Sequence, residues 1–165
     1  MPVLSSEIDR DALTLTFVAE FDGSVERVWQ LWADPRQLER WWGPPTWPAT
    51  FERHDFTEGG ESRYYMTGPE GEKARGWWKT TLIDEPRRIE FDDGFSNDDG
   101  EPAPGDPIKG VVTFEEISSG TRFTIVSTFG SPEYFEEVLG MGMEEGMRGA
   151  LGQIDGVLAD ARQSH

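Results

Sequence analysis

Apolar and polar residues alternate along several segments of the chain, and this alternation predicts a β-sheet. In the segment 13–21 nearly every second residue is apolar, as a strand with one buried face requires. Short Gly-, Pro- and Asp-containing turns separate most of the later strands, and short turns join antiparallel neighbours. The further strands are expected over 50–56, 61–67, 73–84, 87–92, 108–117 and 121–129.

Apolar residues at helical spacing interrupt this strand pattern in two places. After the first strand, Ser24 can cap one short helix, and Pro35 can begin a second that stops at Gly43. Near the other end, the residues 132–162 read as one long helix, with a break expected at Gly140. The pattern predicts an α+β fold in which the long C-terminal helix packs across a curved antiparallel sheet.

The length of 165 residues suits a single domain with one hydrophobic core. We expect residues 13–162 to form this domain, with residues 1–12 as an N-terminal tail and 163–165 as a C-terminal tail. The segment 93–107 is rich in acidic residues, Gly and Pro, so it is expected to be a flexible acidic loop.

The inner face of the sheet and the apolar stripe of the C-terminal helix are expected to enclose a cavity. Only one of Trp77 and Trp78 can point inwards, and alternation with Gly76 selects Trp78. Small residues beside large aromatic ones would leave hollow space, although the aromatic side chains could equally fill the interior. The candidate cavity residues are Trp41, Tyr64, Trp78, Val112, Phe114, Phe123, Ile125, Ser127, Met143, Met147 and Leu151.

Three glycines of the C-terminal helix, Gly142, Gly146 and Gly149, form a narrow stripe beside its apolar residues. Each glycine lowers the stability of a helix, so packing elsewhere must offset that cost. Two explanations stay open at this point: close approach of the helix to the sheet, or room for a ligand.

The amino-acid composition disfavours some classes of binding partner and indicates the cellular compartment. The formal net charge of −17 would repel nucleic acids and anionic membrane surfaces, so neither is expected to bind. The chain has no cysteine, which excludes disulfides and thiolate chemistry. It also shows no long apolar run and no signal-peptide pattern, so a cytoplasmic location is expected.

Candidate catalytic and metal-binding residues are scarce. The only histidines are His54 and His165, which are too few for a multi-histidine metal site. His54 is expected to be a hydrogen-bonded structural residue rather than a general base. No carboxylate pair stands out, and no phosphate-binding or dinucleotide motif is present. We therefore predict no catalytic residues, no metal and no cofactor.

Four segments resemble one known family: 21–29 (FDGSVERVW), 38–44 (LERWWGP), 59–64 (GGESRY) and 142–147 (GMEEGM). They are similar to the homologues of the activator of heat-shock-protein ATPase (AHSA-type), within the START-like (SRPBCC) superfamily. The resemblance implies the helix-grip architecture, also found in birch-pollen-allergen-like proteins, with a cavity between the sheet and the long helix. Fold alone does not assign the function.

The leading hypothesis is a binding domain, rather than an enzyme, that holds a small lipophilic or aromatic molecule in this cavity. One alternative is a protein-interaction or co-chaperone-like module with a protein partner. Another is a cyclase- or aromatase-like enzyme in which His54, Tyr64 or Tyr65 donates a proton. The sequence leaves open the identity of the ligand and whether the chain is a monomer or a homodimer.

Overall fold

One curved antiparallel sheet forms the body of the molecule. The computed structural model describes residues 3–97, 101 and 107–163. Eight strands pair in the order β1-β2-β8-β7-β6-β5-β4-β3. They span β1 Val3–Asp9, β2 Thr14–Phe21, β3 Ala49–His54, β4 Glu61–Thr67, β5 Lys73–Asp84, β6 Arg88–Phe95, β7 Ile108–Ile117 and β8 Gly120–Thr128.

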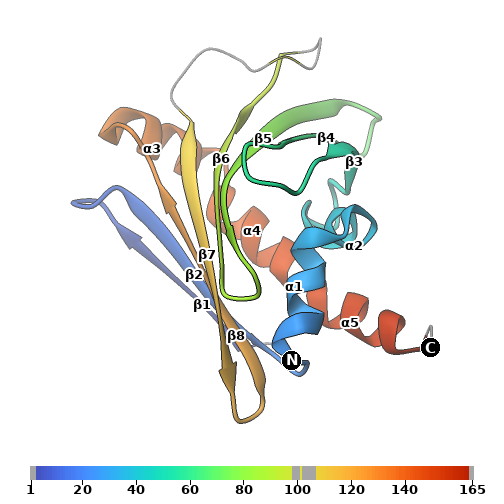
Figure 1. Ribbon diagram of the computed structural model, residues 1–165. Helices are drawn as coiled ribbons and strands as arrows, with labels where there is room; N and C mark the ends of the chain where they lie inside the picture. Colours follow the sequence, from blue (N-terminus) through green and yellow to red (C-terminus); the bar gives the residue numbers. More distant parts are fainter. Residues whose placement is uncertain (1–2, 98–100, 102–106, 164–165) are drawn as a thin grey trace.

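The helices cover the concave side of this sheet (Figure 1). Ser24 caps α1 by accepting a hydrogen bond from the Arg27 amide, and Asp34 caps α2 in front of Pro35. Three further helices follow β8 and lead across the sheet to the C-terminal end. The bounds are α1 Val25–Ala33, α2 Pro35–Trp41, α3 Pro132–Gly140, α4 Met143–Leu151 and α5 Ile154–Gln163. The expected α+β architecture is thus confirmed.

The C-terminal helical layer has two breaks, of which the first follows Gly140, where a break is expected, and the second is additional. Gly142 has φ of +86°, a left-handed conformation that glycine adopts without steric cost, and it separates α3 from α4. A second break at Gly152 separates α4 from α5. These breaks allow the helical segment to change direction as it crosses the curved sheet.

The expected N-terminal tail contributes an edge strand. Residues Val3–Asp9 form β1, which pairs with β2 along its whole length, so the expectation of a tail over residues 1–12 is corrected. The residues of β1 lack a clear alternation of apolar and polar side chains, so the strand is defined by its backbone pairing with β2. At the other end, Gln163 is the last residue of α5, and residues 164–165 of the expected C-terminal tail lie outside the described residues.

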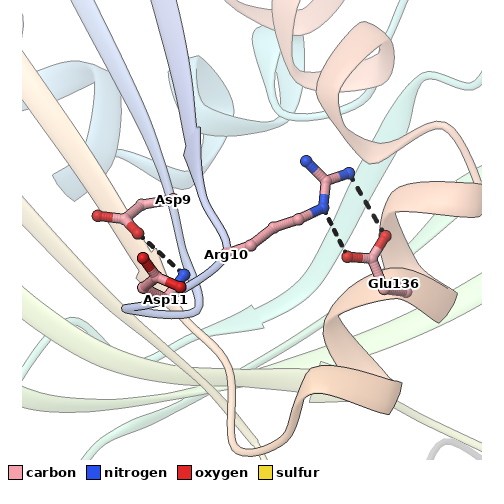
Figure 2. Close-up of polar contacts among 4 residues, drawn as sticks. All are labelled: Asp9, Arg10, Asp11 and Glu136. Carbon is pink, nitrogen blue, oxygen red and sulfur yellow. Dashed lines mark hydrogen bonds and ion pairs between the residues drawn. The ribbon is translucent and has the colours of Figure 1, made fainter.

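Side chains of β1 and of its turn reach the C-terminal helices. Figure 2 shows Arg10 donating to Glu136 of α3, with 2.8 Å between Nε and Oε2. The turn is held by Asp9, whose carboxylate accepts a hydrogen bond from the Asp11 amide. Ser6 donates to Glu144 of α4 at 2.6 Å. The Arg10 pair is exposed and contributes little by itself, but these contacts link the edge of the sheet to the helices.

The expected flexible loop over 93–107 begins later than predicted. Asp93–Phe95 continue β6, and the Ser96 amide still donates to the Arg75 carbonyl at 2.9 Å. The strand continues because Ile89 and Phe91 face the core, and Asp93 occupies the next position on the same face. Residues 98–100 and 102–106, most of the remaining loop, lie outside the described residues.

Aromatic rings pack directly on glycines of neighbouring strands. Gly110 pairs with Phe91, and a Cβ atom at Gly110 would lie 2.6 Å from Cζ of that ring. On the outer face, Trp77 packs in the same way over Gly94, so its side chain is partly buried there, while Trp78 points into the core as predicted. Glycine therefore allows large rings to lie flat against the sheet.

A cluster of tryptophans fills the part of the concave face next to α1 and α2. Trp32 lies at its centre, with its ring centroid 4.8 Å from that of Trp41 and 6.0 Å from that of Trp78. Trp78 in turn stacks on Phe91 at 4.6 Å. Trp29, Trp32, Trp41 and Trp78 are all among the largest fully buried side chains.

No helix in the described part of the chain is long and apolar enough to cross a membrane.

Replacing Gly110 with Ala should destabilise the protein by about 1–3 kcal/mol, because the new methyl group would collide with a Phe91 ring that Trp78 holds in place. Urea unfolding measures this change. Gly140→Ala is the matched control: no atom lies within 4 Å of its Cβ position, so stability should stay equal or rise. Equal effects of the two substitutions would contradict the packing described.

Candidate functional site

A cavity of about 250 Å³ lies between the sheet and the helices α3 and α4. The strands β4, β6 and β7 supply one wall, and the segment after α2 supplies another. Most of the lining is apolar, and among the described residues it includes no Lys, Arg or His. The lining residues are Trp42, Pro44, Tyr64, Met66, Asp93, Phe95, Ile108, Val138, Met141, Gly142, Met143, Gly146 and Met147.

Asp93 is the one carboxylate in this lining within the part of the chain that the structure describes. Its place on β6 continues the inward-facing row of Ile89 and Phe91, where an apolar residue is the usual occupant. Burial raises the pKa of the Asp93 carboxyl to about 7, against the smaller opposing effects of hydrogen bonds from Tyr64 and from the Gly94 amide. The carboxyl group therefore retains a proton at pH values where an exposed aspartate has lost it.

Tyr64 reaches Asp93 by lying across a glycine. Tyr64 on β4 pairs with Gly76 on β5, and a Cβ atom at Gly76 would collide with the Tyr64 hydroxyl. Because that space is free, the hydroxyl extends over β5 and donates a long hydrogen bond of 3.4 Å to Oδ1 of Asp93 on β6. Burial raises the pKa of Tyr64 well above its ordinary value, and the charge of Asp93 raises it further, so Tyr64 stays protonated.

Two indole groups approach the Tyr64 hydroxyl. The rings of Trp42 and Trp78 lie with their centroids 6.1 Å and 6.3 Å from that of Tyr64, and their N–H groups act to lower its pKa. Neither makes a hydrogen bond of acceptable geometry: within the described residues, Nε1 of Trp42 and Nε1 of Trp78 are buried without a partner. Trp42 is 6% exposed and lines the cavity. Both nitrogen atoms are covered by neighbouring atoms, so neither indole N–H opens onto the cavity.

The opposite wall is formed by methionines and glycines. Met141, Met143 and Met147 line the cavity on this side, and Met66 lines it from β4. Gly142 and Gly146 interrupt them, and no atom lies within 4 Å of the Cβ position of either glycine. Gly149 differs, because its Cβ position would lie 3.4 Å from Pro45. The glycine stripe thus leaves open space at two positions and close packing at the third.

The structure places only part of the predicted cavity residues around the cavity. Tyr64, Met143 and Met147 line it, and Trp78 lies just behind Tyr64 and Trp42. Trp41 does not line it, because its indole N–H donates to the Leu31 carbonyl at 2.9 Å inside the core. The other candidates are buried core residues outside the lining: Val112, Phe114, Phe123, Ile125, Ser127 and Leu151.

Sequence reasoning missed Trp42 and Asp93. Trp42 follows directly after α2, so the choice between it and Trp41 depended on where the helix ends. Asp93 was assigned to the loop. Continuing the alternation of Ile89 and Phe91 by one step would have placed it on the inner face of β6.

His54 has a structural environment away from the cavity lining. Its Nε2 lies 2.8 Å from the Trp32 carbonyl oxygen and must donate to it, while Nδ1 lies 2.7 Å from the Ser62 hydroxyl. Burial lowers the pKa of His54, and the contact with the Trp32 carbonyl partly opposes that shift. The hydrogen-bonded histidine expected from the sequence is what the structure shows. Across the described ranges, no group of three His, Asp or Glu residues is arranged to hold a metal ion.

Asp93→Asn should stabilise the protein at alkaline pH. The pKa of Asp93 is about 7 in the folded state and near 4 in an unfolded chain. Between these values the folded state retains a proton that the unfolded state has lost. From pH 5 to pH 8, the free energy of unfolding of the wild type should therefore fall by about 1–3 kcal/mol more than that of the variant.

Urea unfolding at several pH values measures this difference. Asp92→Asn, which removes a carboxylate from the neighbouring position of the same strand, controls for the change in net charge. A pH-independent difference between the wild type and Asp93→Asn would contradict the desolvated carboxyl group.

Comparison with solved structures identifies relatives that share this fold. A protein from Arthrobacter aurescens is 56% identical, with a TM-score of 0.90 and coverage of 94% of this chain and 91% of that one. A protein from Mycobacterium smegmatis is 46% identical, with a TM-score of 0.87 and coverage of 96% and 97%. An AHSA1 protein from Silicibacter pomeroyi, 22% identical with a TM-score of 0.71, covers 92% of this chain and 99% of its own, and shares the fold.

The family comparison agrees with these structures. No curated protein matched the chain. The model of the family described as "Activator of Hsp90 ATPase homolog 1-like protein" matches residues 22–159, which include α1 to α4 and most of the sheet. The resemblance of the four sequence segments is thereby confirmed, and so is the helix-grip fold it implied. This chain belongs to the AHSA1 family.

Proposed function

We propose that this protein binds a small lipophilic or aromatic molecule in the cavity between the sheet and the helices α3 and α4. The observation that carries the proposal is a cavity of about 250 Å³ lined mainly by apolar side chains, with the hydrogen-bonded pair Tyr64 and Asp93 in its lining. Ligand sites commonly combine an apolar lining with a few convergent polar groups.

The methionine-rich wall favours an apolar occupant. Methionine side chains are flexible and polarisable, so they adapt to the outline of a bound molecule. Two large apolar side chains of the lining are also exposed to solvent: Phe95 at 45% and Met141 at 63%. These two residues mark where the cavity meets the surface, and a ligand would enter beside them.

Acid–base catalysis is a second candidate function, favoured by one observation. Asp93 has a pKa of about 7 and accepts a hydrogen bond from Tyr64, and both groups face the cavity. A carboxyl group tuned to neutral pH can both donate and accept a proton. If the protein converts a compound recovered from its cavity, and Asp93→Asn abolishes the conversion, this function is established. If the compound stays unchanged, only the binding function is supported.

The protein-interaction alternative draws on the same exposed side chains. Phe95 and Met141 would form the apolar part of a docking surface for a protein partner. In that case their replacement by Ser would abolish the association with that partner.

Denaturing extraction of the purified protein, analysed by mass spectrometry, tests the binding proposal. A discrete organic compound should be released from the wild type. Gly146→Leu should release much less, because Leu would occupy the open space beside Gly146. The same substitution should keep or raise the stability of α4, since Leu favours a helix by about 0.5–1 kcal/mol over Gly.

Gly156→Leu is the matched control. Gly156 lies in α5, also has no atom within 4 Å of its Cβ position, and does not line the cavity. It should leave the released compound unchanged. The proposal would be contradicted if neither the wild type nor any variant released a compound, or if Gly146→Leu released as much as the wild type.

A further inference from the structure

The carboxyl group of Asp93 has hydrogen-bonding capacity that the protein leaves unused. Its partners are the Tyr64 hydroxyl, which donates to Oδ1 at 3.4 Å, and the Gly94 amide. The two oxygens of a carboxylate can accept about four hydrogen bonds. Asp93 lines the cavity with part of its surface accessible, and neither of its oxygens is among the described side-chain atoms that are buried without a partner. A hydrogen-bond donor of a ligand in the cavity can therefore reach this carboxyl group.

Asp93 lies between the solid core and the mouth of the cavity. Ile89 and Phe91, which precede it in the inward-facing row of β6, are only 2% and 3% exposed. Phe95, the next residue of that row, is 45% exposed at the mouth. A charged group bound to Asp93 would stay close to water, which reduces the cost of removing it from solvent. The apolar part of the same ligand would extend along the apolar lining.

The described surroundings of Asp93 supply no positive charge. They include no Lys, Arg or His in the lining, and no cation contributes to the raised pKa of Asp93. The titratable groups that the charge of Asp93 affects are Tyr64 of β4 and Tyr134 of α3, and burial raises the pKa of both, so both stay neutral. A carboxylate removed from water without a cation is disfavoured. A cationic ligand would remove that penalty, whereas an anionic ligand would increase it.

We infer that the Asp93 carboxylate is a subsite for the ammonium group of an otherwise apolar ligand, whose apolar part lies against Met143 and Met147. This inference rests on the proposed function and adds the class of the ligand: a lipophilic amine, bound as its cation, rather than a hydrocarbon, an alcohol or a carboxylic acid. The N–H groups of an ammonium ion can fill the unused acceptor positions, and hydrogen bonds between charged partners are the stronger ones. The net charge of −17 also raises the concentration of cations near the protein.

Probes that differ in one small group separate the subsite from the cavity. Naphthylmethylamine, naphthylmethanol and ethylnaphthalene share one ring system and one shape, and they end in an ammonium, a hydroxyl and a methyl group. Naphthylacetate ends in a carboxylate. The full-length protein, labelled at its methionine methyl groups, is titrated with each probe and followed by NMR. Met143 and Met147 report occupancy of the cavity.

The amine, the alcohol and the hydrocarbon should all shift these methionine signals. At pH 8 the amine should bind about tenfold more tightly than the alcohol or the hydrocarbon, because it alone brings a charge to the carboxylate. Naphthylacetate should bind most weakly of the four probes.

The affinity for the amine should fall as the pH falls. Between pH 8 and pH 6 the amine stays protonated, whereas the Asp93 carboxyl, with a pKa of about 7 in the free protein, takes up a proton that the bound cation must displace. The affinity for the amine should therefore fall by about tenfold across this range. The affinity for ethylnaphthalene should stay constant.

Asp93→Asn keeps the shape of the side chain and removes its charge. It should lower the affinity for the amine to that for ethylnaphthalene and abolish the pH dependence. Asp92→Asn is the matched control, because it removes a carboxylate from the adjacent residue of β6, whose side chain points to the opposite face. This variant should retain the preference for the amine. Thermal unfolding shows whether each variant is folded.

The outcomes distinguish the two proposals. Equal affinity for the amine, the alcohol and the hydrocarbon at pH 8, with shifted methionine signals, would overturn the ammonium subsite and leave the apolar cavity intact. A preference for the amine that a folded Asp93→Asn protein retains would do the same. Tighter binding of naphthylacetate than of the amine would overturn the cationic class. If no probe shifts the methionine signals, both the subsite and the apolar-ligand cavity are overturned.

Discussion

The packing of aromatic rings onto glycines of the sheet is the constraint on which the rest of this structure depends. Phe91 lies over Gly110, and the Tyr64 hydroxyl lies over Gly76. A side chain at either glycine would push these rings off the sheet. In the first case the result is a solid core, because Trp78 stacks on Phe91. In the second case the ring turns a polar group towards Asp93, and the space beyond it stays open.

The concave face is therefore divided between packing and a hollow. The part beneath α1 and α2 is filled by tryptophans, whose burial supplies the hydrophobic stabilisation of the domain. The part beneath α3 and α4 contains a desolvated carboxyl group, the tyrosine hydroxyl bonded to it and methionines that leave room. Buried polar groups of this kind lower stability, and their concentration at one cavity is the pattern that binding sites show.

The sequence predicted the strands more completely than the site. Alternation and turn residues placed β4, β5 and β7 at their observed bounds, because buried and less buried residues alternate in each strand and turns follow directly at its ends. β1 was missed because its pairing depends on the backbone of β2 rather than on an apolar pattern. Prediction of the cavity residues depended on where two elements end. The end of α2 determines whether Trp41 or Trp42 lines the cavity, and the extension of β6 by three residues places Asp93 on its inner face. Such boundaries follow from tertiary packing, which single-sequence periodicity does not contain.

The central claim is that the aromatic side chains do not fill the interior, and xenon binding tests it most directly. Crystals of the protein exposed to pressurised xenon should show a xenon atom between Met66, Val138 and Met147, because xenon enters apolar cavities. The same experiment should show none within the tryptophan cluster around Trp32. Absence of xenon from the first position, with side chains collapsed across it, would contradict the account.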